Sequence, residues 1–168
     1  TTGFVTDDFN VWPEYLKLVI LGIMMIGGCS GSTSGSFKVI RFIILIKIIL
    51  RELKKLVHPR AIFHVKVGDK TIDPDDLSNV AALTFLFMGI SALSALLLSF
   101  MGVDFTTAIS ASIASLFNIG PGLGGVGAMG NFAAIPSMGK GILITCMILG
   151  RLEIYGILLL LLPIAWRK

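Results

Sequence analysis

The chain has 168 residues, of which 55% are hydrophobic and 14% are charged, and its formal net charge is +4. Soluble domains average about 25% charged residues, whereas the mean hydropathy of this chain is +0.91. The composition excludes a disordered tail and an ordinary cytosolic enzyme, and it indicates an integral membrane protein. One span takes about 20 residues, so the length leaves room for three or four spans and for no sizeable soluble catalytic domain.

A block of small residues follows the first apolar run. Residues 14–26 are mostly apolar, and residues 27–36 are all Gly, Ser, Thr or Cys. Such a block has poor helix propensity, and a helix broken at membrane depth survives only where it is buried in protein or lines a water-filled cavity. We therefore predict an intramembrane loop that lines a pore. The alternative is helix packing through the G-x-x-x-G spacing of Gly27, Gly31 and Gly35.

A basic amphipathic segment comes next. Residues 37–57 alternate apolar runs with Lys and Arg at mostly helical spacing, which is typical of a helix near a membrane surface. The His-Pro pair at 58–59 predicts its end. Weak alternation over 61–72, around a Gly-Asp pair at 68–69, predicts a short hairpin. The run Asp-Pro-Asp-Asp at 73–76 predicts the start of another helix.

The C-terminal half combines two spans with a shorter segment. Residues 80–101 carry no charge and predict a span. Residues 105–117 are apolar but rich in Ser, Thr and Ala, and they are too few to cross a membrane, so we expect a re-entrant half-helix. Residues 118–130 contain six glycines. Residues 140–165 predict the last span, with Arg151 inside it.

The glycine-rich loop suits a cation pathway. Glycine permits backbone angles at which carbonyls can line an axis, and rings of carbonyls replace the hydration shell of a permeant cation. The half-helix before it would direct its partly negative C-terminal end at the same place. A plain extracellular turn remains the alternative. The G-x-G-x-x-G pattern at 122–127 indicates dinucleotide binding only between a strand and a helix, and a helical stretch precedes it here.

The distribution of positive charge predicts the topology. Segments rich in Lys and Arg face the cytoplasm, so we expect 38–79 and the C-terminus inside and 1–13 and 102–139 outside. The basic stretch indicates contact with anionic lipid or a cytosolic partner rather than nucleic acid. Nine of the 14 basic residues lie in that stretch: Lys38, Arg41, Lys47, Arg51, Lys54, Lys55, Arg60, Lys66 and Lys70.

A segment of the chain recurs after a shift of 123 residues. The order Pro, Lys, apolar run and Gly appears in both copies, and a short Gly-containing loop precedes each. We infer a unit of span, half-helix, loop and span, of which the second copy is whole; repeat interfaces in membrane proteins hold substrate and ion sites. The identical pairs are Phe9 and Phe132, Pro13 and Pro136, Lys17 and Lys140, Met24 and Met147, and Gly27 and Gly150.

Arg151 is the notable charge inside a span. Its exposure to lipid would cost at least about 2.5–3.5 kcal/mol, so it should face protein or water. Glu153 points elsewhere on the helix, and both an ion pair and a role in permeation stay open for it. The sequence shows no Ser-His-Asp set, paired carboxylate or metal cluster, and Cys29 and Cys146 are expected to be small buried residues.

Taken together, the motifs resemble one family over essentially the whole chain. They are Thr1-Thr2-Gly3-Phe4; Gly27-Gly28-Cys29-Ser30-Gly31-Ser32-Thr33 with Phe37-Lys38; Arg51-Glu52-Leu53-Lys54 with Val57-His58-Pro59; Asn118-Ile119-Gly120-Pro121-Gly122; and Leu149-Gly150-Arg151-Leu152-Glu153-Ile154. This set resembles the C-terminal part of the Trk-type bacterial potassium uptake proteins, the TrkH/KtrB superfamily.

The resemblance implies an all-α membrane protein in which four span–pore helix–span repeats of one chain surround a single pore. Residues 1–79 would end the third repeat, and 80–168 would form the complete fourth. Each repeat gives one selectivity-filter loop with a central glycine, and potassium would bind the carbonyls of Thr2, Gly3, Ile119 and Gly120. The implied filter residues are Thr1, Thr2, Gly3, Phe4, Asn118, Ile119, Gly120, Pro121 and Gly122.

The resemblance also implies a gate and partners. A flexible loop below the filter would face an arginine of the last span, and the matching residues are Gly27, Gly28, Ser30, Gly31, Ser32, Thr33, Gly35 and Arg151. Family members are usually dimers on a cytosolic ring of nucleotide-binding regulatory subunits, so nucleotide belongs to the partner. Potassium is the permeant ion, and no covalently bound cofactor is implied.

With two of four filter loops, this chain cannot close such a pore, so we expect the missing N-terminal repeats in a longer parent chain. The predicted function is potassium uptake or conduction in the bacterial inner membrane. The alternatives are a multispan membrane enzyme or structural module whose glycine loops are only turns, and a secondary transporter with broken helices. Ser34 and Ser36 depart from the family pattern, where glycine is common.

Overall fold

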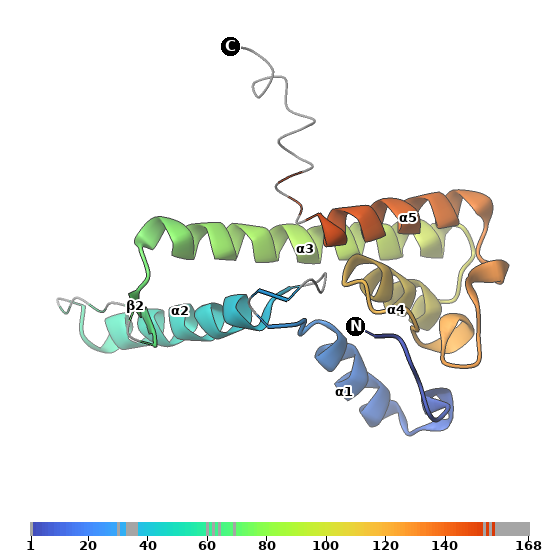
Figure 1. Ribbon diagram of the computed structural model, residues 1–168, viewed down its shortest axis with the longest axis horizontal. Coiled ribbons are helices and arrows are strands. Elements are labelled where there is room, and N and C mark those ends of the chain that lie inside the picture. Colours follow the sequence, from blue (N-terminus) through green and yellow to red (C-terminus); the bar gives the residue numbers. More distant parts are fainter. Residues whose placement is uncertain are drawn as a thin grey trace, which may run out of the picture.

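The computed structural model describes residues 2–29, 31–32, 37–59, 61, 63, 65–68, 70–152, 154 and 156. Helices dominate these residues (Figure 1). The α-helices are α1 (Glu14–Met24), α2 (Val39–Val57), α3 (Pro74–Phe100), α4 (Phe105–Leu116) and α5 (Ser137–Arg151). The 3-10 helices are η1 (Phe9–Val11), η2 (Gly124–Val126) and η3 (Phe132–Ala134), and the strands are β1 (Lys66–Val67) and β2 (Lys70–Thr71).

α3 is the one helix among the described residues that is both long and apolar enough to cross a membrane. Its 27 residues extend for about 40 Å, against a bilayer core of about 30 Å. Asp73 is its N-cap and Pro74 its first residue, a position where the missing N–H of proline costs nothing. The span predicted at 80–101 is therefore present, and the helix starts earlier, at the predicted turn.

α4 is a half-helix that turns back into the molecule. It begins beside the end of α3, runs back along it, and the following loop returns to the same end, where α5 starts (Figure 1). Its 12 residues cover only about 18 Å. The Asp104 carboxylate accepts a hydrogen bond from the Thr107 N–H at 3.4 Å and caps its start. Packing between α3 and α5 buries most of α4, so the short helix predicted at 105–117 is present, and its re-entrance into a membrane stays a prediction.

α5 packs very closely on the C-terminal end of α4. A Cβ atom built on Gly150 would lie 1.7 Å from the Leu116 carbonyl oxygen, so only glycine allows this approach. α5 begins three residues before the span predicted at 140–165 and covers residues 140–151 of it. Glu153 and residues 157–165 lie outside the described residues.

The helical path from α1 to α2 is interrupted, as the block of small residues at 27–36 predicts. α1 ends at Met24 and α2 begins at Val39, and the described residues between them are not helical. Two backbone hydrogen bonds close the base of this loop: Gly27 N–H to the Phe37 carbonyl at 2.9 Å, and Val39 N–H to the Gly28 carbonyl at 3.1 Å. We call this pair of bonds the neck of the loop.

α2 runs alongside the first part of α3 (Figure 1). Ile44 on α2, Leu77 on α3 and Val65 before β1 form a shared core. The isoleucine face of α2 therefore packs on α3, and the location of this helix near a membrane surface stays a prediction. The predicted hairpin is present, with Val67 paired to Lys70.

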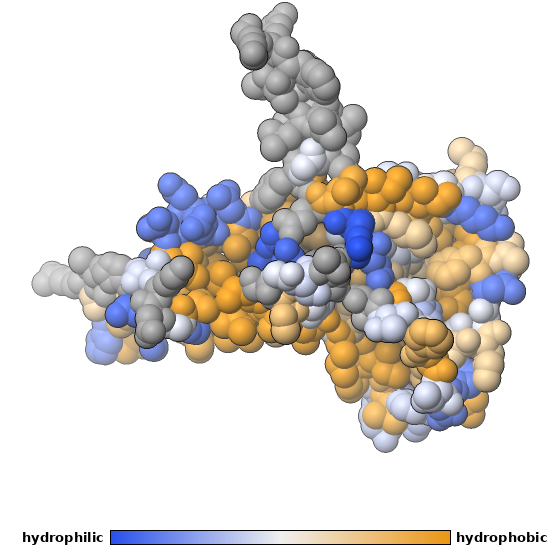
Figure 2. Space-filling view, in the orientation of Figure 1, coloured by the Kyte–Doolittle hydropathy of each residue, from blue (hydrophilic) through white to orange (hydrophobic). Residues whose placement is uncertain are grey.

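Polar and apolar side chains separate along the length of the molecule. Figure 2 shows apolar residues over much of the visible face, hydrophilic residues at the end that holds the hairpin and at the opposite end, and a further hydrophilic group near the middle. The hairpin end also contains the close of α2 and the start of α3. Hydrophilic ends beside a large apolar surface are expected for a chain that lies partly in hydrocarbon.

Replacing Gly150 with alanine should destabilise the protein, because the new methyl group would collide with backbone at Leu116. Overpacking of this kind costs about 1–3 kcal/mol. Gly141 on the same helix has no atom within 4 Å of its Cβ position, so Gly141→Ala is the matched control. Thermal unfolding of the detergent-solubilised protein should show a lower melting temperature for Gly150→Ala alone. Equal melting temperatures for the two variants would contradict the close contact.

Candidate functional site

Two glycine loops that are distant in sequence lie side by side. Gly3 has φ +79° and Gly120 has φ +114°, values that other residues rarely adopt. A Cβ atom on Gly3 would lie 3.2 Å from the Ile119 carbonyl oxygen, and one on Gly120 would lie 3.7 Å from the Gly3 Cα. The described part of the first loop, residues 2–4, therefore meets the loop at 118–122. Thr1 lies outside the described residues.

The end of α4 shapes the second loop. Asn118 has φ +53°, a left-handed conformation that asparagine tolerates better than most residues. Its amide nitrogen Nδ2 donates to the Met147 carbonyl of α5 at 3.3 Å and to the Leu116 carbonyl at 3.4 Å. The next N–H, of Ile119, bonds the Ala114 carbonyl at 2.8 Å. The partly negative end of the helix thus lies directly before the loop, which favours a cation.

Hydroxyl groups of α4 hold the returning part of the loop. Ser110 Oγ accepts from the Leu123 N–H at 2.9 Å and donates to the Leu123 carbonyl at 3.0 Å. Thr107 Oγ1 accepts from the Gly125 N–H at 3.0 Å. The 122–127 pattern therefore forms a 3-10 turn against a helix, and it lacks the preceding strand that dinucleotide binding requires.

Asn10 clamps the two halves of the site together, across 114 positions of sequence. Its Oδ1 accepts from the Gly124 N–H at 2.9 Å, and its Nδ2 donates to the Gly124 carbonyl at 3.2 Å. Gly127 lies so close that a Cβ atom there would be 2.0 Å from Nδ2. Asn10 was not predicted as a site residue from the sequence. Its position in the repeat could have identified it, because the equivalent residue of the second copy is Ala133 and only the first copy has an amide there.

The two copies of the repeat share their local geometry. Asp8 accepts from the Asn10 N–H at 3.0 Å before η1, and Asn131 accepts from the Ala133 N–H at 2.9 Å before η3. Each 3-10 helix then leads to a proline N-cap, with φ and ψ of −54° and 148° in the first copy and −55° and 151° in the second. The register deduced from sequence identity therefore reappears in the backbone.

The predicted gate residues are only partly described. Gly27 and Gly28 form the neck, while Gly31 has φ +88° and Ser32 N–H bonds the Cys29 carbonyl at 3.1 Å. Ser30, Thr33 and Gly35 lie outside the described residues.

Arg151 ends α5 one residue after the contact of Gly150 with α4. It is exposed, and it forms no hydrogen bond or ion pair with the described part of the chain. One apolar cluster connects the neck with the end of α5. Phe37 of the neck and Ile154, three residues after Arg151, pack in this cluster with Phe117. The loop base and the end of α5 are therefore at a similar depth.

The acidic groups before η1 and before α4 serve as local hydrogen-bond acceptors. Asp7 accepts from Trp12 Nε1 at 3.1 Å, and Asp8 and Asp104 cap η1 and α4. Among the described residues no group of three or more His, Cys, Asp or Glu is arranged to hold a metal ion.

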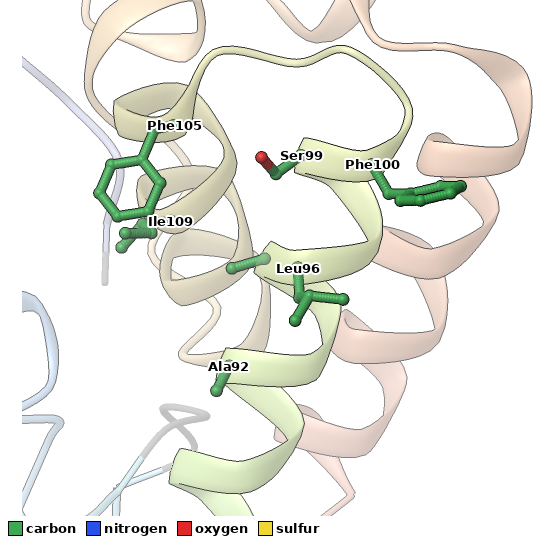
Figure 3. Close-up of a pocket in the computed structure, with 7 residues that line it drawn as sticks. Ala92, Leu96, Ser99, Phe100, Phe105 and Ile109 are labelled. Carbon is green, nitrogen blue, oxygen red and sulfur yellow. The ribbon is translucent and has the colours of Figure 1, made fainter.

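Two hollows lie near the site, one against the glycine loops and one against the half-helix. One, of about 330 Å³, lies against both glycine loops and includes Gly3, Ile119 and Met24 in its lining. The other, of about 600 Å³, lies between α3 and α4 (Figure 3). Its lining is apolar except for the hydroxyl of Ser99. The first hollow therefore has the carbonyl-bearing wall, and the second suits an apolar neighbour.

Replacing Asn10 with alanine should loosen the 124–127 turn, because two cross-loop hydrogen bonds are lost. Each such bond contributes about 0.5–1.5 kcal/mol. Amide hydrogen exchange in the peptide around Gly124 should become faster in Asn10→Ala. Asn131→Ala removes only a local cap at η3 and serves as the control. Unchanged exchange around Gly124 would contradict the clamp.

Comparisons with known proteins agree with this architecture. The sequence model of the TrkH family, described as cation transport proteins, matches residues 1–165. The Trk system potassium uptake protein TrkI of Halomonas elongata is 38% identical over 100% of this chain and 34% of its own length. The Trk system potassium uptake protein TrkH of Escherichia coli (strain K12) is 40% identical, again over 100% and 34%.

A crystal structure of the potassium transporter TrkH from Vibrio parahaemolyticus superposes with a TM-score of 0.87 at 40% identity, covering 98% of this chain and 35% of that one. The chain thus spans about a third of the length of these relatives. Their transport names speak against the membrane-enzyme alternative, and the all-α membrane fold is confirmed. This chain belongs to the TrkH family of cation transport proteins.

Proposed function

We propose that this chain forms part of a potassium-conducting pore in a bacterial inner membrane. The observation that supports it most is the meeting of Gly3 and Gly120, both with positive φ, at the C-terminal end of a buried half-helix. The relatives are named as potassium uptake proteins, which favours potassium as the permeant ion.

Ion selection would rest on backbone carbonyls. Carbonyls of Thr2, Gly3, Ile119 and Gly120 would take the place of water around a dehydrated ion. The positive φ values of the two glycines turn successive carbonyls in directions that an ordinary extended loop does not reach. Asn118, Pro121, Gly122 and the residues flanking Gly3 would hold that backbone in place.

The rest of the pore would come from the remainder of a longer parent chain, since this chain spans about a third of its relatives. We assign residues 1–79 to the end of a third pore repeat and 80–168 to a complete fourth. The matching geometry before α1 and α5 supports this assignment.

The loop between α1 and α2 would act as the gate, with Arg151 opposite it. Its neck ties Gly27 to Phe37 and Gly28 to Val39, so the two flanking helices are joined at the base of the proposed gate. Such a loop at membrane depth must line a cavity or be covered by protein. We include Ser30, Thr33 and Gly35 in the gate on the basis of the family resemblance.

We propose a cytoplasmic location for 38–79 and the C-terminus, on the basis of the positive charge there. The relatives are named as components of a Trk system, and we propose a homodimer that binds a cytosolic nucleotide-binding regulatory subunit. Any nucleotide would then bind the partner, and this chain would carry no covalent cofactor.

Gly120→Ser in the intact parent protein should weaken the preference for K⁺ over Na⁺. A side chain at φ +114° strains the backbone by about 1–3 kcal/mol, although its Cβ has room at 3.7 Å from Gly3, so the loop should deform rather than unfold. The measurement is K⁺ and Na⁺ uptake in a potassium-transport-deficient bacterium. Gly141→Ser, where the Cβ meets open space, is the control.

The result distinguishes a selectivity filter at 118–122 from a purely structural turn. The filter assignment is supported if the unaltered parent rescues growth at low K⁺ and Gly120→Ser lowers selectivity about tenfold. A tenfold change in selectivity corresponds to about 1.4 kcal/mol. Full rescue with unchanged selectivity would mean that 118–122 is only a turn. If the unaltered parent fails to rescue despite membrane expression and a compatible regulatory subunit, the potassium proposal is wrong.

Arg151→Gln should raise K⁺ leak through the resting protein, because a fixed positive charge near the path opposes cation entry. The measurement is K⁺ efflux from proteoliposomes containing the parent protein without its regulatory subunit. Lys140→Gln, on the same helix but bonded to the Ala133 carbonyl at the outer end, is the control. Leak that stays at the unaltered level in Arg151→Gln would remove this residue from the gate.

A further inference from the structure

A basic pocket lies between α2 and the hairpin. It has a volume of about 280 Å³, and its walls are Lys47, Leu50, Arg51, Lys54, Phe63, Val65 and Lys66. The four residues from α2 follow the i, i+3, i+4, i+7 spacing of one helix face. Phe63, Val65 and Lys66 come from the segment that packs back on that face. Four cationic side chains are therefore gathered around one small concave site.

Nearby acids compensate only part of this charge. The Lys47 ammonium donates to the Lys66 carbonyl. Because a carbonyl is neutral, this bond does not compensate the positive charge of Lys47. Arg51 pairs with Glu52 at 2.8 Å, and this contact holds the pKa of the Glu52 carboxyl below its usual range. Lys54 and Lys66 have no acidic partner within the described ranges. The pocket thus keeps a clear positive excess beside the apolar surfaces of Phe63 and Val65.

An exposed apolar stripe runs along α2 next to the pocket. It consists of Phe42, Ile46, Ile49, Leu53 and Leu56, whose exposed fractions range from 38% to 79%. At 3.6 residues per turn, this stripe lies about a third of a turn from the basic face. Leu50 lies between the two and is 50% exposed. A ligand with an anionic head and apolar tails would match both surfaces at once.

The depth of the pocket fits the edge of the bilayer. The charge-free stretch of α3 starts at Leu77, which packs with Ile44 of α2. Lys47 is three residues beyond Ile44, about 4.5 Å further along α2 than the level of Leu77. The headgroup layer on each side of the hydrocarbon is about 5–7 Å thick. Helical side chains lean toward the N-terminus of their helix, so Lys47 and Arg51 reach back into that layer.

We propose that this pocket binds the phosphate-bearing headgroup of an anionic phospholipid, with its acyl chains beside Phe42 and Ile46, at the end of the stripe nearer the hydrocarbon. Ammonium and guanidinium groups recognise phosphate by charge-assisted hydrogen bonds. The apolar pocket wall suits the glycerol backbone. This inference depends on the membrane location of the chain and not on its ion conduction, so the two proposals can fail separately.

The test uses the intact parent protein, stripped of lipid in a neutral detergent and titrated with phosphatidylglycerol or with phosphatidylcholine of the same chain length. Bound lipid is counted by native mass spectrometry. Phosphatidylglycerol should bind more tightly than phosphatidylcholine. The double variant Lys54→Gln with Lys66→Gln should bind phosphatidylglycerol about 25-fold more weakly, roughly fivefold per charge removed, and phosphatidylcholine unchanged.

Lys55→Gln is the matched control. Lys55 is in the same turn as Lys54, but it pairs with Glu52 at 3.3 Å and does not line the pocket, so its loss should change affinity less than about twofold. An equal loss in Lys55→Gln would mean diffuse surface charge and would overturn the proposal. So would unchanged binding in the double variant.

Two further measurements test whether the pocket binds free phosphate or a protein instead of a phospholipid. Inorganic phosphate should compete only weakly with phosphatidylglycerol, because it has no acyl chains for the stripe; equal affinity would identify a free-phosphate site instead. If the double variant loses binding of the purified regulatory subunit while phosphatidylglycerol binding persists, the pocket is a protein-docking face and the lipid proposal is wrong.

Discussion

The contact of Gly150 with the Leu116 carbonyl is the constraint on which the rest of the site depends. It lets α5 approach the end of the half-helix closely enough for Asn118 to reach the Met147 carbonyl. That bond fixes where the chain leaves α4, and therefore where Gly120 meets Gly3. The position of the loop is therefore set by the packing of α5 on α4 together with the side chain of Asn118.

Irregular backbone at membrane depth carries polar groups that lipid cannot satisfy. Among the described residues, three irregular segments have specific hydrogen-bond partners. The neck takes up the N–H of Gly27 and of Val39, and Asn10 takes both backbone groups of Gly124. Ser110 does the same for Leu123. Hydroxyl and amide side chains that look incidental in an apolar sequence therefore make the loops possible.

These side-chain partners mark the boundary of what could be predicted from the sequence. Length and composition were enough to predict α3, the half-helix and the break before α2, because each depends on local propensity and on the thickness of the bilayer. The pairing of the 2–4 and 118–122 loops came from the repeat and the family resemblance. The Asn10 clamp was missed, since its partner is 114 positions away. The direction of α2 depends on packing against α3, which helix periodicity alone does not specify.

The two repeats diverge at one shared glycine. Gly150 stays helical and serves close packing on Leu116, whereas its counterpart Gly27 lies beyond the end of α1 and bonds Phe37. After Gly150 the chain continues with Arg and Leu, while after Gly27 it continues with Gly, Cys and Ser, which favour the helix far less. A few small residues after the shared glycine thus replace a helix by a closed loop. The backbone groups that leave the helix form the two hydrogen bonds of the neck instead. The asymmetry thus leaves a loop closed by the neck in one repeat, while in the other the same position supports the loop at 118–122.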